Sequence, residues 1–268
     1  MASLKEIIKI EYQKCASDPI HFMKKYCYIQ HPVRGMIPFH LFQFQERTLT
    51  EFDKERYNIV LKSRQTGIST LVAGFSLWKM LFNSDYNILI IATKQEVAKN
   101  LVTKVRYMND NLPSWLKQTA IEDNKLSLRY SNGSQIKATS AAGDAGRSEA
   151  LSLLVFDEAA FIDKIDSIWT AAQQTLATGG DCIALSTPNG VGNWFHRMWV
   201  DAEAGGEFNT IKLHWTVHPE RNQEWRDEQE KLLGPKGAAQ ECDCDFVSSG
   251  DTVIDPQLLM FYKETYVQ

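Results

Sequence analysis

Four short apolar runs, separated by helical stretches, constrain the fold of this chain most strongly. Each run is continuous and rich in Ile, Leu or Val, a pattern typical of strands buried on both faces of a parallel sheet. The runs are "YNIVL" (57–61), "NILIIA" (87–92), "LSLLVF" (151–156) and "CIALS" (182–186). Helical spacing occurs between them, over 68–82, 94–108 and 164–177. The alternation predicts an α/β fold with a mostly parallel central sheet flanked by helices.

Flanking segments extend this predicted core. Asn132-Gly133 lies between two alternating segments and predicts a hairpin within 126–140. The segment 28–40 contains two prolines and a glycine, and we expect it to be irregular. The remaining predicted elements are a helical extension over 3–26, a helix over 41–54, a strand over 210–215 and a polar helix over 220–232.

Composition excludes some classes of protein. Hydrophobic residues make up 44% and charged residues 23% of the chain, ordinary values for a globular protein. No apolar run approaches the roughly 20 residues needed to span a bilayer, so we expect an intracellular setting. The formal charge of −4 is unlike that of a free-standing nonspecific DNA binder, which is usually basic. A nucleic-acid role would therefore use local patches or several subunits together.

The stretch "LKSRQTGIST", Leu61–Thr70, is close to a phosphate-binding loop. The P-loop template is G-x-x-x-x-G-K-[ST], and Gly67 and Ser69 fit it. Lys62 stands in place of the first glycine, and Ile68 stands in place of the lysine. The stretch follows a predicted strand and opens a predicted helix, so helix N-terminal amides are available for an anion. Either Lys62 or Arg64 could supply the missing charge; the alternative is an ordinary strand-to-helix turn.

Two further motifs follow predicted strands. "LLVFDEAAF" ends in adjacent acids, of which Asp157 would hold Mg²⁺ and Glu158 would polarise an attacking water. "ALSTPNG" places Ser186 and Thr187 at the C-terminal end of a strand, where α/β sheets carry ligand groups. The alternatives are an acidic helix cap for the first motif and simple turn chemistry for the second.

Two accessory residues fit the same chemistry. Gln45 lies on the helix before the loop strand, where an amide can pair with adenine, and Gln43 is its rival. Arg147 stands in the Gly-flanked stretch "GDAGRSEALS" and is a candidate arginine finger for a neighbouring subunit. Together, the loop, the acid pair and the hydroxyl pair occur in the chain order of helicase-like motor ATPases. The sequence therefore predicts a Mg²⁺-dependent ATPase that binds ATP.

The sequence resembles the ATPase domain of the large terminase subunit of tailed bacteriophages. The resemblance implies a P-loop NTPase of the ASCE/RecA-like type, a motor that hydrolyses ATP to drive double-stranded DNA into a procapsid. It also implies partners, namely a portal protein and a small terminase subunit, and a ring of large subunits. That ring is expected to be a pentamer on the capsid, with a possible monomer in isolation. The stretches that carry the resemblance include "YCYIQHPVRGMIPFHLFQFQ", "LKSRQTGIST", "DAGRSEALSLLVFDEAAFI", "ALSTPNGVGNWFHRMW" and "ECDCDFVSSGDTVIDP".

The resemblance also assigns roles to residues. It places the acids on Asp157 and Glu158, the trans-acting arginine on Arg147, and the coupling motif on Ser186, Thr187 and Pro188. Ile68 departs from the commonest pattern, but some members carry their lysine at the start of the loop, where Lys62 stands. Ser69 and Asp157 are the expected metal ligands. The residues expected to bind nucleotide are Gln45, Lys62, Ser63, Arg64, Gln65, Thr66, Gly67, Ile68, Ser69, Thr70 and Thr187.

The resemblance further implies a domain organisation. We expect a helical N-terminal extension over 1–40, an ATPase core over 41–245 and a linker-like tail over 246–268 toward a nuclease domain. Nuclease activity is not expected from this chain, and Asp251 and Asp255 are not expected to be nuclease ligands. The expected location is the host cytoplasm, transiently at the portal vertex. The alternatives are a helicase-like DNA translocase and a catalytically weak nucleotide-binding scaffold.

Overall fold

The computed structural model of the protein describes residues 3–140, 150–249 and 265. The chain divides into two compact units. Unit 1 comprises Met1–Arg56, Gly67–Asp157 and Ile162–Ile183, and unit 2 comprises Tyr57–Thr66, Glu158–Phe161 and Ala184–Gln268. The chain passes from one unit to the other within the phosphate loop, at Thr66–Gly67, and within the acid pair, at Asp157–Glu158.

Unit 1 contains the larger part of the sheet, in the strand order β9-β8-β4-β7-β6-β5. Strands β7, β4 and β8 are parallel, and Ile90 pairs with Ala138 on one side and Val155 on the other. Because the apolar residues of β8 are buried on both faces, this strand has the continuous hydrophobic sequence of a central parallel strand. The strands are β4 (Asn87–Ala92), β5 (Ala120–Asp123), β6 (Ser127–Tyr130), β7 (Gln135–Ser140), β8 (Leu153–Asp157) and β9 (Asp181–Ser186), of which β9 ends in unit 2.

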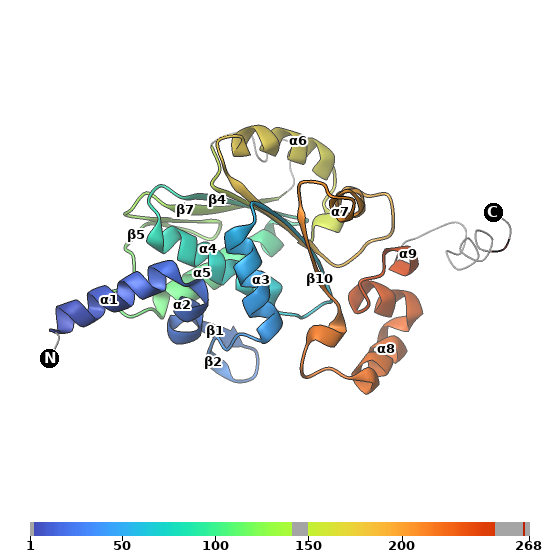
Figure 1. The fold of residues 1–268 in the computed structure, drawn as a ribbon, viewed down its shortest axis with the longest axis horizontal. Helices are drawn as coiled ribbons and strands as arrows, with labels where there is room; N and C mark the ends of the chain where they lie inside the picture. The colour runs from blue at the N-terminus through green and yellow to red at the C-terminus, as the bar shows by residue number, and fades with distance from the viewer. Residues whose placement is uncertain (1–2, 141–149, 250–264, 266–268) are drawn as a thin grey trace. The chain divides into compact units, whose positions relative to one another are not determined.

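Helices cover both faces of this part of the sheet, with α4 and α5 on one face and α6 on the other (Figure 1). Helix α4 is apolar over most of its surface because it is packed between the sheet and other helices. Gly74 allows α2 to approach it, since a Cβ there would lie 3.0 Å from the Met23 sulfur. The helices of unit 1 are α1 (Leu4–Ser17), α2 (Pro19–Tyr26), α3 (Gln43–Lys54), α4 (Ile68–Phe82), α5 (Gln95–Asp110) and α6 (Ile165–Leu176).

The carboxylate of Glu11 joins α1 to α2. Its Oε1 lies 2.8 Å from Lys25 Nζ, 2.7 Å from His21 Nε2 and 2.9 Å from the Tyr26 hydroxyl. These partners favour the ionised carboxylate, Lys25 most of all, and lower the pKa of Glu11 to about 2.

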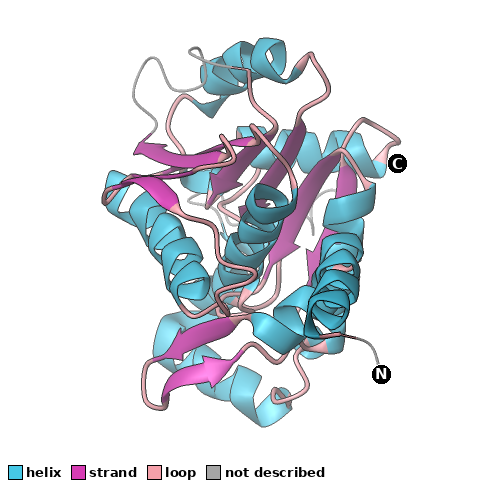
Figure 2. Cartoon of the chain, turned by 90° about the vertical axis from the view of Figure 1, so that its left-hand side faces the viewer, coloured by secondary structure: helices cyan, strands magenta, loops and turns pink. Residues whose placement is uncertain are grey.

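The segment 28–40 is a hairpin, so the prediction of irregular structure was wrong. Strands β1 (Tyr28–His31) and β2 (Gly35–Pro38) pair antiparallel and form a separate two-stranded sheet, visible at the bottom of Figure 2. The prolines do not prevent this, because Pro32 falls in the turn and Pro38 at the end of β2. Gly35 supplies the left-handed backbone, with a φ of 67°, that closes the turn.

Unit 2 is built on β3 (Tyr57–Lys62) and β10 (Asn209–Leu213), in the order β10-β3-β9. The first two strands are parallel, with Val60 opposite Ile211. The polar helix predicted over 220–232 is longer, because α8 continues past a kink at Gly234, where φ is 74°. The helical elements are η1 (Ala159–Phe161), α7 (Trp194–Glu203), η2 (Trp215–Val217), α8 (Gln223–Glu241) and α9 (Phe246–Ser249).

Most sequence predictions of secondary structure are confirmed. The four apolar runs form β3, β4, β8 and β9, and the Asn132-Gly133 turn joins β6 to β7 in an antiparallel pair. The predicted class, a mostly parallel sheet flanked by helices, is also correct. Within residues 3–140 and 150–249, no helix is both long enough and apolar enough to cross a membrane.

Candidate active site

The phosphate loop occupies the connection between β3 and α4. Two of its residues, Gln65 and Gly67, have left-handed backbone conformations, with φ of 56° and 75°. Gly67 caps α4, and a Cβ at this position would lie 2.7 Å from Gln45 Nε2, so both the space and the conformation favour glycine. Turns of this kind direct successive N–H groups to one side and can bind an anion at the helix start.

Within unit 2, Lys62 at the start of the loop is paired with Glu158. The lysine Nζ donates to Glu158 Oε1 over 2.8 Å, and the lysine side chain is only 6% exposed. A buried ammonium group requires a partner charge, and the second acid of the motif provides it. The last residue of β3 and the first residue after β8 thus form an ion pair at the carboxyl ends of their strands.

The other oxygen of Glu158 faces the hydroxyl motif. Ser186 Oγ and the Thr187 backbone N–H each donate to Glu158 Oε2 over 3.4 Å. Ser186 Oγ also accepts from the Ala160 N–H over 3.1 Å, which fixes the hydroxyl. Glu158 has a left-handed backbone, with a φ of 56°. Three predicted motifs therefore converge on one carboxylate in unit 2.

In unit 1, the predicted metal ligands lie side by side. Ser69 Oγ donates to Asp157 Oδ1 over 3.3 Å, and Asp157 is only 6% exposed. A hydroxyl and a carboxylate oxygen are donors that Mg²⁺ accepts. Ser69 lies in the first turn of α4, where the helix dipole also favours bound phosphate. The donor set therefore fits the predicted ion.

Ile68 stands at the usual lysine position of the loop, and Arg64 is the second candidate for the phosphate-binding cation. The two side chains differ in burial. Ile68 is only 1% exposed and belongs to the hydrophobic core of unit 1. Arg64 Nη1 donates to Glu241 Oε2 over 3.0 Å, and this carboxylate raises the pKa of Arg64. The Arg64 side chain is 68% exposed, whereas the Lys62 side chain is buried beside Glu158. Lys62 is thus the loop cation that lies next to the predicted catalytic residue.

Arg221, which the sequence interpretation missed, holds the first half of the loop in place. Its guanidinium donates to Ser63 Oγ over 3.0 Å, to the Arg64 carbonyl over 2.9 Å and to the Gln65 carbonyl over 3.0 Å. The guanidinium also lies 4.3 Å from the ring centroid of Trp225. No motif marks this arginine, because its partners are distant in sequence. A planar fork of donors suits the fixation of consecutive backbone carbonyls.

Of the remaining predicted residues, Gln45 and Thr66 lie in the described part of the chain. Gln45 is only 3% exposed, and its Oε1 accepts from the Phe42 N–H over 3.0 Å, whereas Gln43 is exposed. The adenine contact of Gln45 stays a prediction. Thr66 is buried, and its hydroxyl donates to the Ser63 carbonyl over 3.0 Å. Arg147 lies outside the described residues.

Comparisons with known proteins agree with the fold described above. Residues 59–261 match the family model of the terminase large subunit, T4likevirus-type, N-terminal. The fold is similar to the large terminase ATPase domain of Thermus phage P74-26, with 23% identity, coverage of 78% of this chain and 95% of that chain, and a TM-score of 0.65.

Two longer terminases are also similar. The HK97 bacteriophage large terminase has 18% identity and a TM-score of 0.68, and the match covers 85% of this chain and 54% of that chain. The large terminase of the thermophilic bacteriophage D6E in complex with ADP has 12% identity and a TM-score of 0.62, with coverage of 75% and 52%. The chain thus spans about half the length of these two terminases. The match to the family model, which covers residues 59–261, establishes that the chain belongs to the family of terminase large subunits, T4likevirus-type, and corresponds to their N-terminal part.

Proposed function

We propose that the chain binds ATP with Mg²⁺ and hydrolyses it to move double-stranded DNA into a viral procapsid. The observation that carries this proposal is the convergence of Lys62, Ser186 and Thr187 on the carboxylate of Glu158. A protein that merely binds nucleotide has no need of a glutamate positioned in this way. Membership of the terminase family supports DNA as the substrate of the motor.

The phosphates are bound along the loop from Lys62 to Thr70. Loop amides and the start of α4 supply hydrogen bonds and a favourable dipole. Lys62 is the main cation in this proposal, because Arg64 is held by Glu241 and Ile68 is buried in the core. Approach of the triphosphate gives Lys62 a second anionic partner and leaves Glu158 available to a water molecule.

Ser69 and Asp157 would hold Mg²⁺, which when bound supplies charge neutralisation at the phosphates. Glu158 orients the attacking water and accepts its proton. Ser186 and Thr187 hydrogen-bond to Glu158, so a change in the position or charge of Glu158 during hydrolysis would shift these two residues. Such a shift would move the segment that follows β9. Arg147 of a neighbouring subunit would neutralise charge on the transferred phosphoryl group.

The partners in this proposal are a portal protein, a small terminase subunit and further copies of this chain in a ring. A ring also explains how a domain with a net charge of −4 acts on DNA, since several local basic patches would act together. The site of action is the portal vertex in the host cytoplasm. Cleavage of DNA is not proposed for this chain.

Steady-state phosphate release tests the proposed function. The wild-type chain, assembled with DNA and portal, should release phosphate from Mg·ATP, and Glu158→Ala should reduce the rate while ATP binding persists. Equal rates for the wild type and Glu158→Ala would reject the enzymatic role. Binding of ATP without release by the wild-type assembly would instead favour a scaffold.

A further inference from the structure

The turn that follows β9, residues 188–190, is tied by hydrogen bonds to two other segments of unit 2. Asn189 Nδ2 donates to the Ala160 carbonyl over 3.1 Å. The Gly190 N–H donates to Ser249 Oγ over 2.9 Å. One bond therefore joins the turn to the segment after the acid pair, and the other joins it to α9.

The last residue of α9 is Ser249, a buried polar residue of which only 2% is exposed. Its hydroxyl accepts from the Gly190 N–H and donates to the Phe246 carbonyl over 3.0 Å. The hydroxyl thus uses both its donor and one of its acceptor positions. Gly190 is buried as well, so loss of this hydroxyl would leave its N–H without a partner, which is costlier than the mere loss of a hydrogen bond.

Helix α9 is held against α7 by its first residue. The ring centroid of Phe246 lies 4.9 Å from that of His196, with an angle of 77° between the rings, an edge-to-face arrangement. The Phe246 centroid also lies 6.2 Å from that of Phe195 and 6.4 Å from that of Trp199. Because a helix of four residues is not stable alone, these ring contacts and the bond from Gly190 fix the position of α9.

The turn directly follows the two residues that donate to the carboxylate of Glu158. Thr187, whose N–H donates to Glu158 Oε2 over 3.4 Å, stands three positions before Gly190. Ala160, which accepts from the turn, donates its own N–H to the hydroxyl of Ser186, the second donor to Glu158 Oε2. Both donors lie 3.4 Å from that oxygen, near the upper limit for a hydrogen bond. A small displacement of the turn would therefore break these contacts.

We propose that Ser249 is a positioning residue for ATP hydrolysis, because it fixes the turn after β9 and, through the turn, the donors that orient Glu158. This proposal rests on the proposed function of Glu158 in hydrolysis. It makes the rate of hydrolysis depend on the position of α9. A displacement of α9 slows hydrolysis and leaves the binding of ATP unchanged.

The test measures kcat and KM for Mg·ATP by phosphate release from the full chain assembled with DNA and portal, and ATP affinity by calorimetric titration. Ser249→Ala should lower kcat about 5- to 30-fold, the factor expected for loss of one buried hydrogen bond, with KM and affinity within about twofold of the wild type. Ser249→Thr and Ser249→Val have side chains of the same shape. The threonine variant retains the hydroxyl and should have the higher kcat of the two.

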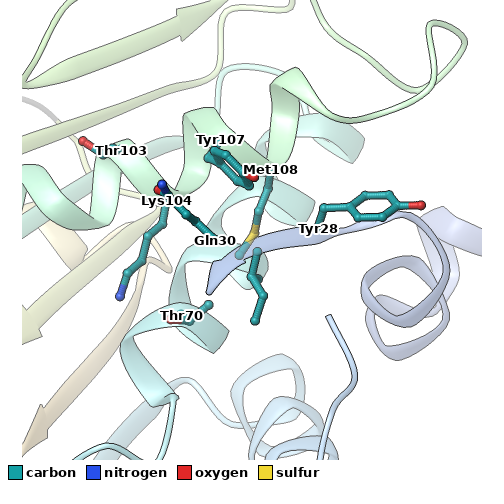
Figure 3. A pocket seen from close by; sticks show the side chains of 8 residues that line it. Tyr28, Gln30, Thr70, Thr103, Lys104, Tyr107 and Met108 are labelled. Carbon is teal, nitrogen blue, oxygen red and sulfur yellow. The ribbon is translucent and has the colours of Figure 1, made fainter. Parts of the chain in front are cut away.

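Two control variants should keep the kcat of the wild type. Ser76→Ala removes a buried hydroxyl of α4 that has no hydrogen-bond partner among the described residues. Thr103→Ala removes a hydroxyl that bonds within its own helix, since it donates to the Lys99 carbonyl over 3.0 Å. Thr103 lies on α5 at the wall of a cavity in unit 1, as Figure 3 shows, and not beside the turn. Thermal unfolding of each variant sets a temperature at which all of them are folded.

Three results would overturn the role of Ser249: an unchanged kcat in Ser249→Ala, equal kcat values in Ser249→Thr and Ser249→Val, or equal losses of kcat and ATP affinity in Ser249→Ala. If Glu158→Ala loses activity while Ser249→Ala does not, the role of Ser249 alone is rejected. Full activity of Glu158→Ala would instead reject the proposed function and, with it, the role of Ser249.

Discussion

Lys62 Nζ lies 2.8 Å from Glu158 Oε1, although the two residues are 96 positions apart in the chain. The ion pair joins the first residue of the phosphate loop to the second acid of the β8 motif, both within unit 2. It explains how a loop with isoleucine at its usual lysine position retains a cation. It also predicts that substitution of either residue changes the position of the other residue's side chain.

Glu158→Gln should lower the rate of ATP hydrolysis by about 10²- to 10⁴-fold, the usual contribution of a general base. The amide keeps the size of the side chain but cannot accept a proton from water. ATP affinity should stay within a few-fold of the wild type, measured with a fluorescent analogue in the presence of Mg²⁺. Retention of more than half of the wild-type rate would argue that another group orients the water.

Arg221→Ala should reduce nucleotide affinity, because three hydrogen bonds to Ser63, Arg64 and Gln65 are lost and the loop is no longer fixed. Loss of a single hydrogen bond from a charged group costs about 1.5–3 kcal/mol, so a decrease of about tenfold or more is expected. Arg221→Lys should recover part of the affinity.

Arg226→Ala is a matched control for this variant. Arg226 pairs with Asp243 and Glu230, neither of which belongs to the phosphate loop, so its loss should lower thermal stability with little change in affinity. Equal effects of both variants on affinity would mean that Arg221 acts through the stability of the unit.

Arg147 is predicted to act on the nucleotide of a neighbouring subunit. Arg147→Ala and Glu158→Ala chains should each be inactive in uniform assemblies. Mixed assemblies should regain activity, because some interfaces combine an intact arginine with an intact glutamate. Phosphate release across a range of mixing ratios measures this, and the presence of both chains in one assembly is checked by differential tagging. An absence of rescue in verified mixed assemblies would contradict action in trans.

Glu11 should make folding stability depend on pH. Its pKa of about 2 in the folded chain is below the ordinary value of 4.5, so the contribution is complete above about pH 4.5 and is lost as the pH falls toward about 2. The difference in free energy of unfolding between the wild type and Glu11→Gln should shrink over that range. Denaturant unfolding at several pH values measures it; a constant difference would show that Glu11 is not stabilised as an anion.

The sequence predicted what is encoded locally. The apolar runs of β3, β4, β8 and β9 have the continuous pattern of buried parallel strands, and the loop has a motif with fixed spacing. The hairpin of β1 and β2 was not predicted, because prolines usually interrupt strand pairing; here Pro32 lies in the turn and Pro38 at the end of a strand, so the pairing stays intact. The role of Arg221 was also missed, since it contacts Ser63 across 158 positions and has no periodic signature.

The nucleotide affinities of Lys62→Ala and Ile68→Ala test the central claim most directly. Calorimetric titration with Mg·ATP, with Arg64→Ala as the comparison, measures all three variants on the same scale. If Lys62 is the lysine that binds the phosphates, Lys62→Ala should lower the affinity for Mg·ATP by a factor of at least about one hundred, or abolish measurable binding. Losses of this size are expected when a charge-assisted contact with phosphate is removed. Ile68→Ala, which lowers stability through a core cavity, should bind ATP at a temperature where it is folded. Strong binding by Lys62→Ala together with loss of binding by folded Ile68→Ala would contradict the account.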